Sequence, residues 1–192
     1  RWMTRYYRST NSFDDNSSIT NTDGGAIEFQ GNAGQSHNNT VNNSYFHAVD
    51  WSAADQKGLM TTIYEGGGDM YFTYNTVHLT GASSVLSTGD APKVFHNEVW
   101  DVGHLQTDGA VVQIMQGEAP GAEVAYNWIH DVIKYGVRFD APIGQPGQGR
   151  NGTMHHNVIW NAAGGLMVKG DYHDIHNNTV FNSSASKNDI IA

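Results

Sequence analysis

A short motif recurs along this chain and constrains the fold more than any other feature. It consists of an apolar residue, two variable residues, Asn, one variable residue, and then Val or Ile. The clear copies have their anchors at Asn75, Asn97, Asn127, Asn157 and Asn178. Asn39 with Val41, and Asn11 with Phe13, are weaker copies. Successive anchors lie 21 to 36 residues apart, which indicates one fixed corner joined by loops of changing length.

A glycine-led strand follows most anchors. Its copies lie at 24–29, 58–60, 109–114, 136–139 and 165–168. Each begins at a glycine turn and continues as a short apolar or alternating strand. No helical period is visible. The sequence therefore predicts an all-β fold, a right-handed parallel β-helix, built as a single-stranded solenoid of about six to seven coils. We expect Asn at the corners, because Asn tolerates the left-handed backbone region and stacked amides can form a hydrogen-bonded ladder.

An antiparallel sandwich with Asn-rich turns is the alternative fold. It would show hairpins with two-residue Asn-Gly or Asp-Gly loops at regular spacing, whereas this chain repeats one asymmetric motif. We expect one β-helix domain over 1–192. We also expect it to be a fragment of a longer chain, because Ile190 and Ile191 look like the start of another strand.

From about Asn11 onward, the Asn-anchored corners resemble those of the right-handed parallel β-helix repeat proteins, the pectate-lyase-like superfamily. That group includes polysaccharide lyases, glycoside hydrolases, epimerases, adhesins and phage tailspikes, so the resemblance specifies the fold more than the activity. It implies a secreted or extracellular protein with a polysaccharide as partner, and it allows further domains of the same chain.

Composition excludes several classes of function. The chain has no Cys, which excludes a disulfide framework, a Cys-ligated zinc site and a thiol nucleophile. Its net charge of −9 argues against a nucleic acid as partner. No apolar run is long enough to span a membrane, so we expect no membrane partner.

Basic residues concentrate in one segment of this acidic chain. Between 134 and 170 they are Lys134, Arg138, Arg150 and Lys169, opposed only by Asp140. Like charges this close repel each other unless a counter-charge offsets them. The segment therefore predicts an anionic ligand, with Lys134 and Arg150 among the substrate-binding residues.

Aromatic side chains are expected in a column on the outside of the solenoid. If Val99 and Ile129 point inward, Trp100, His130 and Trp160 point outward from neighbouring coils. Flat rings beside short polar groups suit a sugar chain, so these three are candidate substrate-binding residues. The alternative is that they pack against a loop or a neighbouring segment.

The glycine-led strands predict a second outward column, which holds Gln113 and Arg138. Asp140 and Lys169, two residues further along their strands, should join Arg138 in one salt-bridge network. A Lys or Arg there could abstract the α-proton of a uronate while another cation stabilises the enolate. We therefore take Arg138, Lys169 and Asp140 as catalytic candidates and Gln113 as a substrate contact. The alternative is a surface ion-pair cluster.

His104 and His173 lie at expected turns beside carboxylates and are the acid/base candidates. Alginate- and chondroitin-type β-helix lyases, which the chain resembles in pairing Lys with Arg on neighbouring coils, place acidic calcium ligands beside that pair. Here only Asp140 is near, so the resemblance allows calcium as a cofactor without assigning a metal ligand.

These features together predict a secreted polysaccharide-active or polysaccharide-binding β-helix that acts on an anionic glycan, uronate or sulfated, by lyase or hydrolase chemistry. The competing hypothesis is a non-catalytic structural solenoid, such as an adhesin, stalk or fibre segment. Insertions of unequal length near 50–68, 117–123 and 141–152 favour a shaped site, because a purely structural solenoid tends towards short uniform coils.

Overall fold

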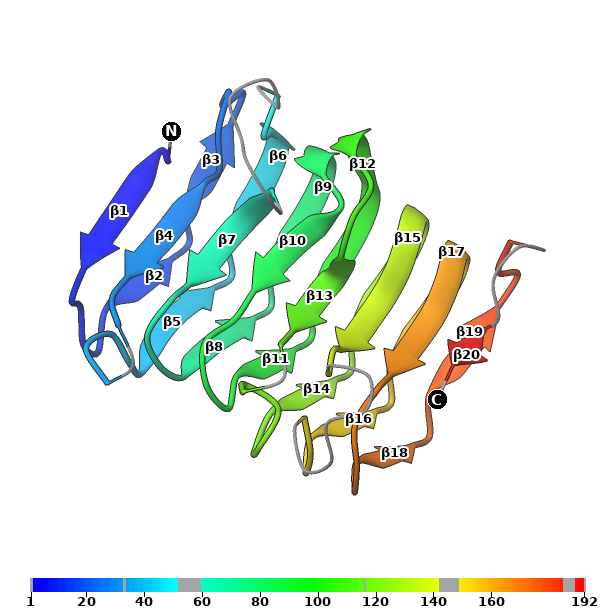
Figure 1. Cartoon of the computed structure of the whole chain (residues 1–192). Helices are drawn as coiled ribbons and strands as arrows, with labels where there is room; N and C mark the ends of the chain where they lie inside the picture. The colour runs from blue at the N-terminus through cyan, green and yellow to red at the C-terminus, as the bar shows by residue number, and fades with distance from the viewer. Residues whose placement is uncertain are drawn as a thin grey trace.

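The computed structural model describes residues 2–32, 34–51, 60–115, 117–141, 149–184 and 189–191. Within these residues the chain is all-β, without a helix, and forms a parallel β-solenoid of about six turns (Figure 1). All printed strand pairs are parallel, and the two chain ends lie at opposite ends of the solenoid (Figure 1). The predicted β-helix architecture is confirmed, and the antiparallel sandwich is excluded.

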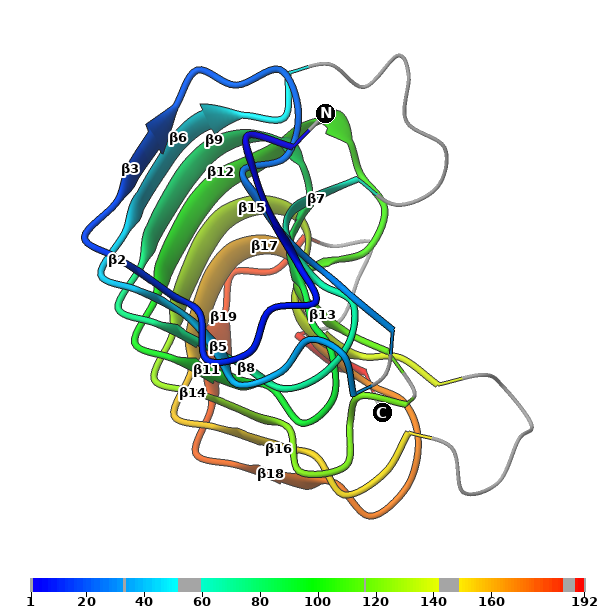
Figure 2. The same cartoon turned by 90° about the vertical axis from the view of Figure 1, so that its left-hand side faces the viewer.

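Each turn contributes strands to three faces (Figure 2). The first face contains β3 (Ser18–Thr20), β6 (Tyr45–Val49), β9 (Thr76–Ala82), β12 (Glu98–Gln106) and β19 (Thr179–Phe181). The second face contains β1 (Thr4–Tyr7), β4 (Ile27–Gln30), β7 (Thr61–Glu65), β10 (Ser84–Ser87), β13 (Ala110–Ile114) and β20 (Ile190–Ile191). Two long strands, β15 (Trp128–Phe139) and β17 (Val158–Val168), run from the first face onto the second and join them into one sheet.

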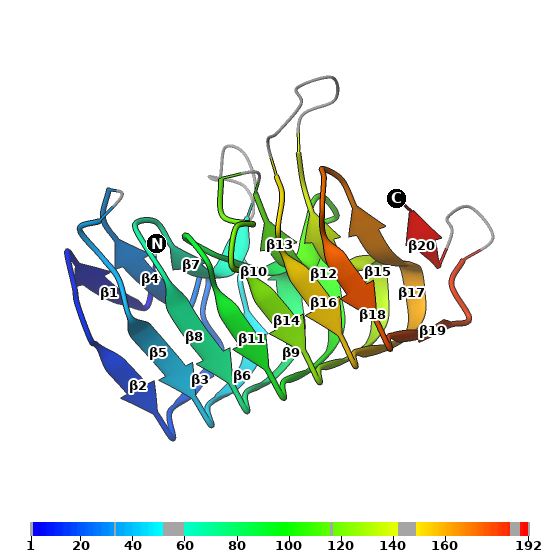
Figure 3. The same ribbon diagram turned by 90° about the horizontal axis from the view of Figure 1, so that it is seen from below.

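The third face is a separate sheet whose strands lie side by side along the solenoid (Figure 3). Its strands are β2 (Phe13–Asp15), β5 (Asn39–Asn42), β8 (Met70–Thr73), β11 (Lys93–Phe95), β14 (Glu123–Ala125), β16 (Thr153–His155) and β18 (Asp174–His176). The chain passes from this face through the motif corner to the first face, and then to the second.

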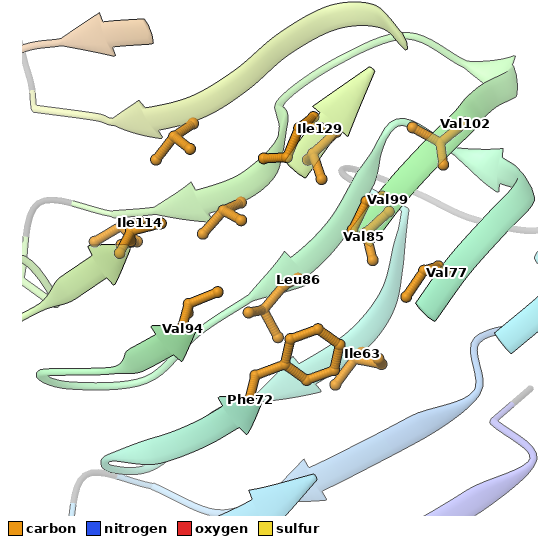
Figure 4. Packing of buried hydrophobic residues seen from close by; sticks show 14 of the residues in the cluster. Ile63, Phe72, Val77, Val85, Leu86, Val94, Val99, Val102, Ile114 and Ile129 are labelled. Atoms are coloured by element: carbon orange, nitrogen blue, oxygen red, sulfur yellow. The ribbon is translucent and has the colours of Figure 1, made fainter. Parts of the chain in front are cut away.

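The core fills the space between the three faces. Register places equivalent residues above one another, so that Val99 pairs with Ile129 and Ile129 with Ile159. All three are buried, as the motif predicts. Phe72 from the third face and Leu86 from the second point into the same interior (Figure 4). Burial of these stacked apolar columns is the main favourable term in folding.

The motif corner is held by buried side-chain amides. Each anchor accepts hydrogen bonds from the anchor of the preceding coil: the Oδ1 of Asn127 lies 3.0 Å from the backbone N and 2.8 Å from the Nδ2 of Asn97. The same contacts link Asn75 to Asn97, Asn127 to Asn157, and Asn157 to Asn178. We call this row the Asn ladder (Asn75, Asn97, Asn127, Asn157 and Asn178). It provides acceptors for backbone N–H groups that lie in the turn and therefore have no partner in the sheets.

Two details of the corner differ from expectation. The left-handed residue is the one before the anchor, such as Tyr74 (φ 57°) or Tyr126 (φ 59°), because the anchor itself points its amide inward. In the first two coils the anchor position holds serine: Ser17 N–H donates to Ser44 Oγ at 3.1 Å, and Ser44 N–H donates to Asn75 Oδ1 at 2.9 Å. Asn11 and Asn39 are therefore not anchors.

The glycine-led strands appear as β4, β13 and the second halves of β15 and β17. Of the copy expected at 58–60, Gly58 and Leu59 lie outside the described residues, and β7 begins at Thr61.

Candidate functional site

Outward side chains of the second face form one column in exact parallel register. Arg138 lies next to Gln113 on one side and Met167 on the other, as expected. The register extends the column towards the N-terminus through Ser87, Tyr64, Glu28 and Arg5. Glu28, Ser87 and Gln113 are buried although they point away from the core. These three side chains are therefore shielded from solvent by other parts of the chain, so that only part of the column is open.

The predicted charge network is present on this face. Arg138 Nη2 lies 2.7 Å from Asp140 Oδ2, and Lys169 Nζ lies 2.9 Å from Asp140 Oδ1. The side chains of Arg138, Asp140 and Lys169 are 17%, 18% and 34% exposed. Gln113 Nε2 approaches Asp140 Oδ2 at 3.4 Å. One carboxylate thus holds two cations, and the network retains one net positive charge at a half-buried position.

A second acidic group on this face has no counterpart in the sequence motifs. Burial raises the pKa of Glu118 to about 8, so this carboxyl carries a proton near neutral pH. Its Oε2 accepts hydrogen bonds from Met115 N–H at 2.7 Å and from the Thr88 hydroxyl at 3.3 Å. Burial raises the pKa of Tyr64, and the charges of Glu118 and Glu28 raise it further. Glu118 follows β13 in a loop, where no strand periodicity could have indicated it.

His173 is occupied by backbone groups. Its Nδ1 accepts a hydrogen bond from Gly152 N–H at 3.1 Å, and its Nε2 donates to the Lys169 carbonyl at 3.0 Å. The ring also packs 4.7 Å from Phe139. With both nitrogens engaged, His173 fixes the turn at Gly152 against Lys169, and the geometry suits positioning better than proton transfer.

In the described part of the chain, none of the remaining charged candidates forms an ion pair with this network. His104 Nε2 is 3.0 Å from Asp101 Oδ1, on β12 of the first face. Lys134 lies on β15 four residues before Arg138. Arg150 is exposed, and its backbone pairs with Asp171 in an isolated bridge. The structure therefore brings together Arg138, Asp140, Lys169 and Gln113 but places His104 elsewhere.

The predicted aromatic column is present on the first face, and its rings stack on one another. Trp100 lies between His78 (4.3 Å, 5°) and His130 (5.7 Å, 2°). Trp160 lies between His130 (4.2 Å, 9°) and Phe181 (6.0 Å, 4°). Both faces of Trp100, His130 and Trp160 are covered, so a sugar could reach only their edges. The rings therefore pack on one another, rather than against a loop or a neighbouring segment as the alternative had it, and the strand spacing of about 4.8 Å could have indicated this stacking.

Among the described residues, no group of three or more His, Asp or Glu side chains is placed to hold a metal ion. No helix in the same residues is long and apolar enough to cross a membrane.

Comparison of the chain with models of protein families, with curated proteins and with solved structures finds no significant match.

Proposed function

We propose that the second face binds an anionic polysaccharide, a uronate or sulfated glycan, and that the protein is a secreted polysaccharide-binding or polysaccharide-active solenoid. The Arg138–Asp140–Lys169 network carries this proposal. Two cations share one carboxylate, so a carboxylate or sulfate group of a ligand adds the missing counter-charge. The guanidinium of Arg138 also suits planar oxyanions such as carboxylate and sulfate.

The same face holds the groups that cleavage would need. In a β-elimination, Lys169 would have to give up its proton and its ion pair with Asp140 before its amine takes the proton α to the uronate carboxyl. The electrons of that C–H bond then form the new carbon–carbon double bond. The bond to the leaving glycosidic oxygen then breaks, and water gives that oxygen its proton. Arg138 stabilises the enolate charge. In the hydrolytic alternative, Asp140 is one of the two carboxyl groups that the reaction needs.

Turnover and binding of anionic polysaccharides test this proposal. The protein is incubated separately with polygalacturonate, alginate and chondroitin sulfate. Formation of double bonds, which reports elimination, and formation of new reducing ends are measured in separate assays. Arg138→Ala and Lys169→Ala should each weaken binding by about tenfold or more. Lys93→Ala is the matched control, because Lys93 pairs with Glu123 on the third face. Equal binding by wild type and both second-face variants would refute the assignment.

A non-catalytic structural solenoid is the second candidate, and one observation favours it. The stacked rings and the Asn ladder both run along the axis without interruption from Asn75 to Asn178, as a stalk or fibre would require. A folded protein that neither binds nor cleaves any of the three polysaccharides would support this candidate.

A further inference from the structure

A second surface feature lies at the motif corner, between the third and first faces and away from the Arg138 network. It is a hollow of about 470 Å³ lined by the corner residues Tyr74, His96, Tyr126 and His156 and by Glu98 and Trp128. We call it the corner hollow. None of its residues belongs to the second face, so it is independent of the function proposed above.

Part of the lining of the corner hollow is a stack of rings. Tyr74 and His96 lie 4.8 Å apart with planes at 10°, and His96 and Tyr126 lie 5.0 Å apart at 9°. Each ring is on a left-handed corner residue, which turns its edge outward. The Tyr74 and Tyr126 hydroxyls and the His96 ring nitrogens make no hydrogen bond to another described side chain. These rings therefore offer a row of donors and acceptors that no described side chain uses.

Trp128 also lines the corner hollow and differs from the other tryptophans of the first face. Trp128 is 55% exposed, and no other ring among the described residues stacks on its indole. Its neighbours in register are Glu98 and Val158. Trp100 and Trp160, in contrast, have both ring faces covered. Trp128 thus presents an open indole surface, which solvent does not favour.

We propose that the corner hollow is a binding subsite for a neutral sugar chain. A pyranose has an apolar C–H face that can lie on the Trp128 indole, and equatorial hydroxyls that can reach the Glu98 carboxylate and the corner rings. Concave sites with aromatic walls and a few placed polar groups are typical of small-ligand binding. Glu98 is the one carboxylate lining the hollow among the described residues, and it disfavours an anionic sugar by like-charge repulsion.

The indole N–H signals in a ¹H–¹⁵N NMR spectrum test the proposal. The Trp128 signal is assigned by its absence in Trp128→Phe, and maltohexaose, cellohexaose, mannohexaose and xylohexaose are added in turn. We expect at least one to shift the Trp128 signal while the Trp100 and Trp160 signals stay in place. Trp128→Ala should weaken the binding of that oligosaccharide by about tenfold or more, and Glu98→Gln should weaken its binding by a smaller factor.

Two controls make the outcome specific. Tyr172 is also an exposed aromatic residue, so Tyr172→Ala should bind as wild type does. Arg138→Ala should leave neutral-sugar binding intact, which separates this subsite from the second face. The proposal is overturned if none of the four oligosaccharides moves the Trp128 signal. It is also overturned if sedimentation shows that wild type self-associates through this surface and Trp128→Ala does not, because the hollow would then be a protein contact.

Discussion

Replacing one amide of the Asn ladder should destabilise the solenoid measurably. Asn127 is buried in the middle of the ladder and has five side-chain hydrogen-bond contacts, in which the two Nδ2 hydrogens are shared among three acceptors. Its Oδ1 accepts from the backbone N–H and the Nδ2 of Asn97. Its Nδ2 donates to the carbonyls of Val94 and Ala125 and to Asn157 Oδ1. Asn127→Leu keeps the number of side-chain heavy atoms and removes all of these contacts.

The size of the effect follows from which partners lose their only bond. Asn97 Nδ2 still donates to the Phe72 carbonyl, and Asn157 Oδ1 still accepts from Asn127 N–H. The Asn97 backbone N–H is left without a partner in a buried place, which costs about 1–3 kcal/mol. Loss of the bonds to the two carbonyls adds about 1 kcal/mol. We expect the free energy of unfolding to fall by about 3 kcal/mol.

Equilibrium unfolding in urea gives this value from the midpoint and slope. Asn178→Leu is the graded control, because Asn178 is half-buried and its Nδ2 bonds the Met154 and His176 carbonyls instead of a further anchor, so the loss should be about half as large. If Asn127→Leu unfolds at the wild-type midpoint, or if Asn178→Leu costs more, the ladder does not act as described.

Three further perturbations have defined outcomes. Trp100→Ala removes a half-buried ring that is stacked between two histidines. It should lower the free energy of unfolding by about 2 kcal/mol and leave the binding of anionic glycans unchanged. An unchanged free energy of unfolding would contradict the packing role. Burial raises the pKa of Asp50 to about 7, above its unfolded value, so folding favours the protonated acid. The free energy of unfolding of the wild type should therefore fall by a few kcal/mol as the pH rises from about 4 through about 7. The free energy of unfolding of Asp50→Asn should change less over the same pH range. Gly89→Ala would place a Cβ 1.9 Å from the Gly68 carbonyl oxygen and should destabilise by more than about 1 kcal/mol, whereas Gly117→Ala, with open space around its Cβ position, should be neutral.

The repeating part of the fold could be predicted because the same physical demand recurs on every coil. Inward Val and Ile at a fixed distance from the anchor identify the core columns, and parallel stacking follows from one asymmetric motif. The first coils could not be placed by the same rule. Serine hydroxyls at Ser17 and Ser44 replace the amide, and Asn39 with Val41 imitates the motif at another place in the coil.

Prediction of the site was limited by features that have no period. The pairing of Arg138 and Lys169 through Asp140 followed from strand alternation and was expected. The position of the Glu118 carboxyl depends on how the loop after β13 folds. Trp128 stands in a variable position of the motif, and its open ring becomes apparent only when the stacking of the other tryptophans is known. Loops and ring contacts depend on tertiary structure, which the sequence pattern does not encode.

The salt dependence of anionic-glycan binding tests the central claim most directly. The affinity of wild type and of the Arg138→Ala/Lys169→Ala double variant for a uronate oligosaccharide is measured by calorimetry at rising ionic strength. Wild-type affinity should fall steeply as the Debye length shrinks from about 30 Å at 0.01 M to about 8 Å at 0.15 M, and the double variant should bind weakly with little further change. Equal affinity of the two proteins at low salt, or wild-type binding that salt leaves unchanged, would contradict an anionic site on the second face.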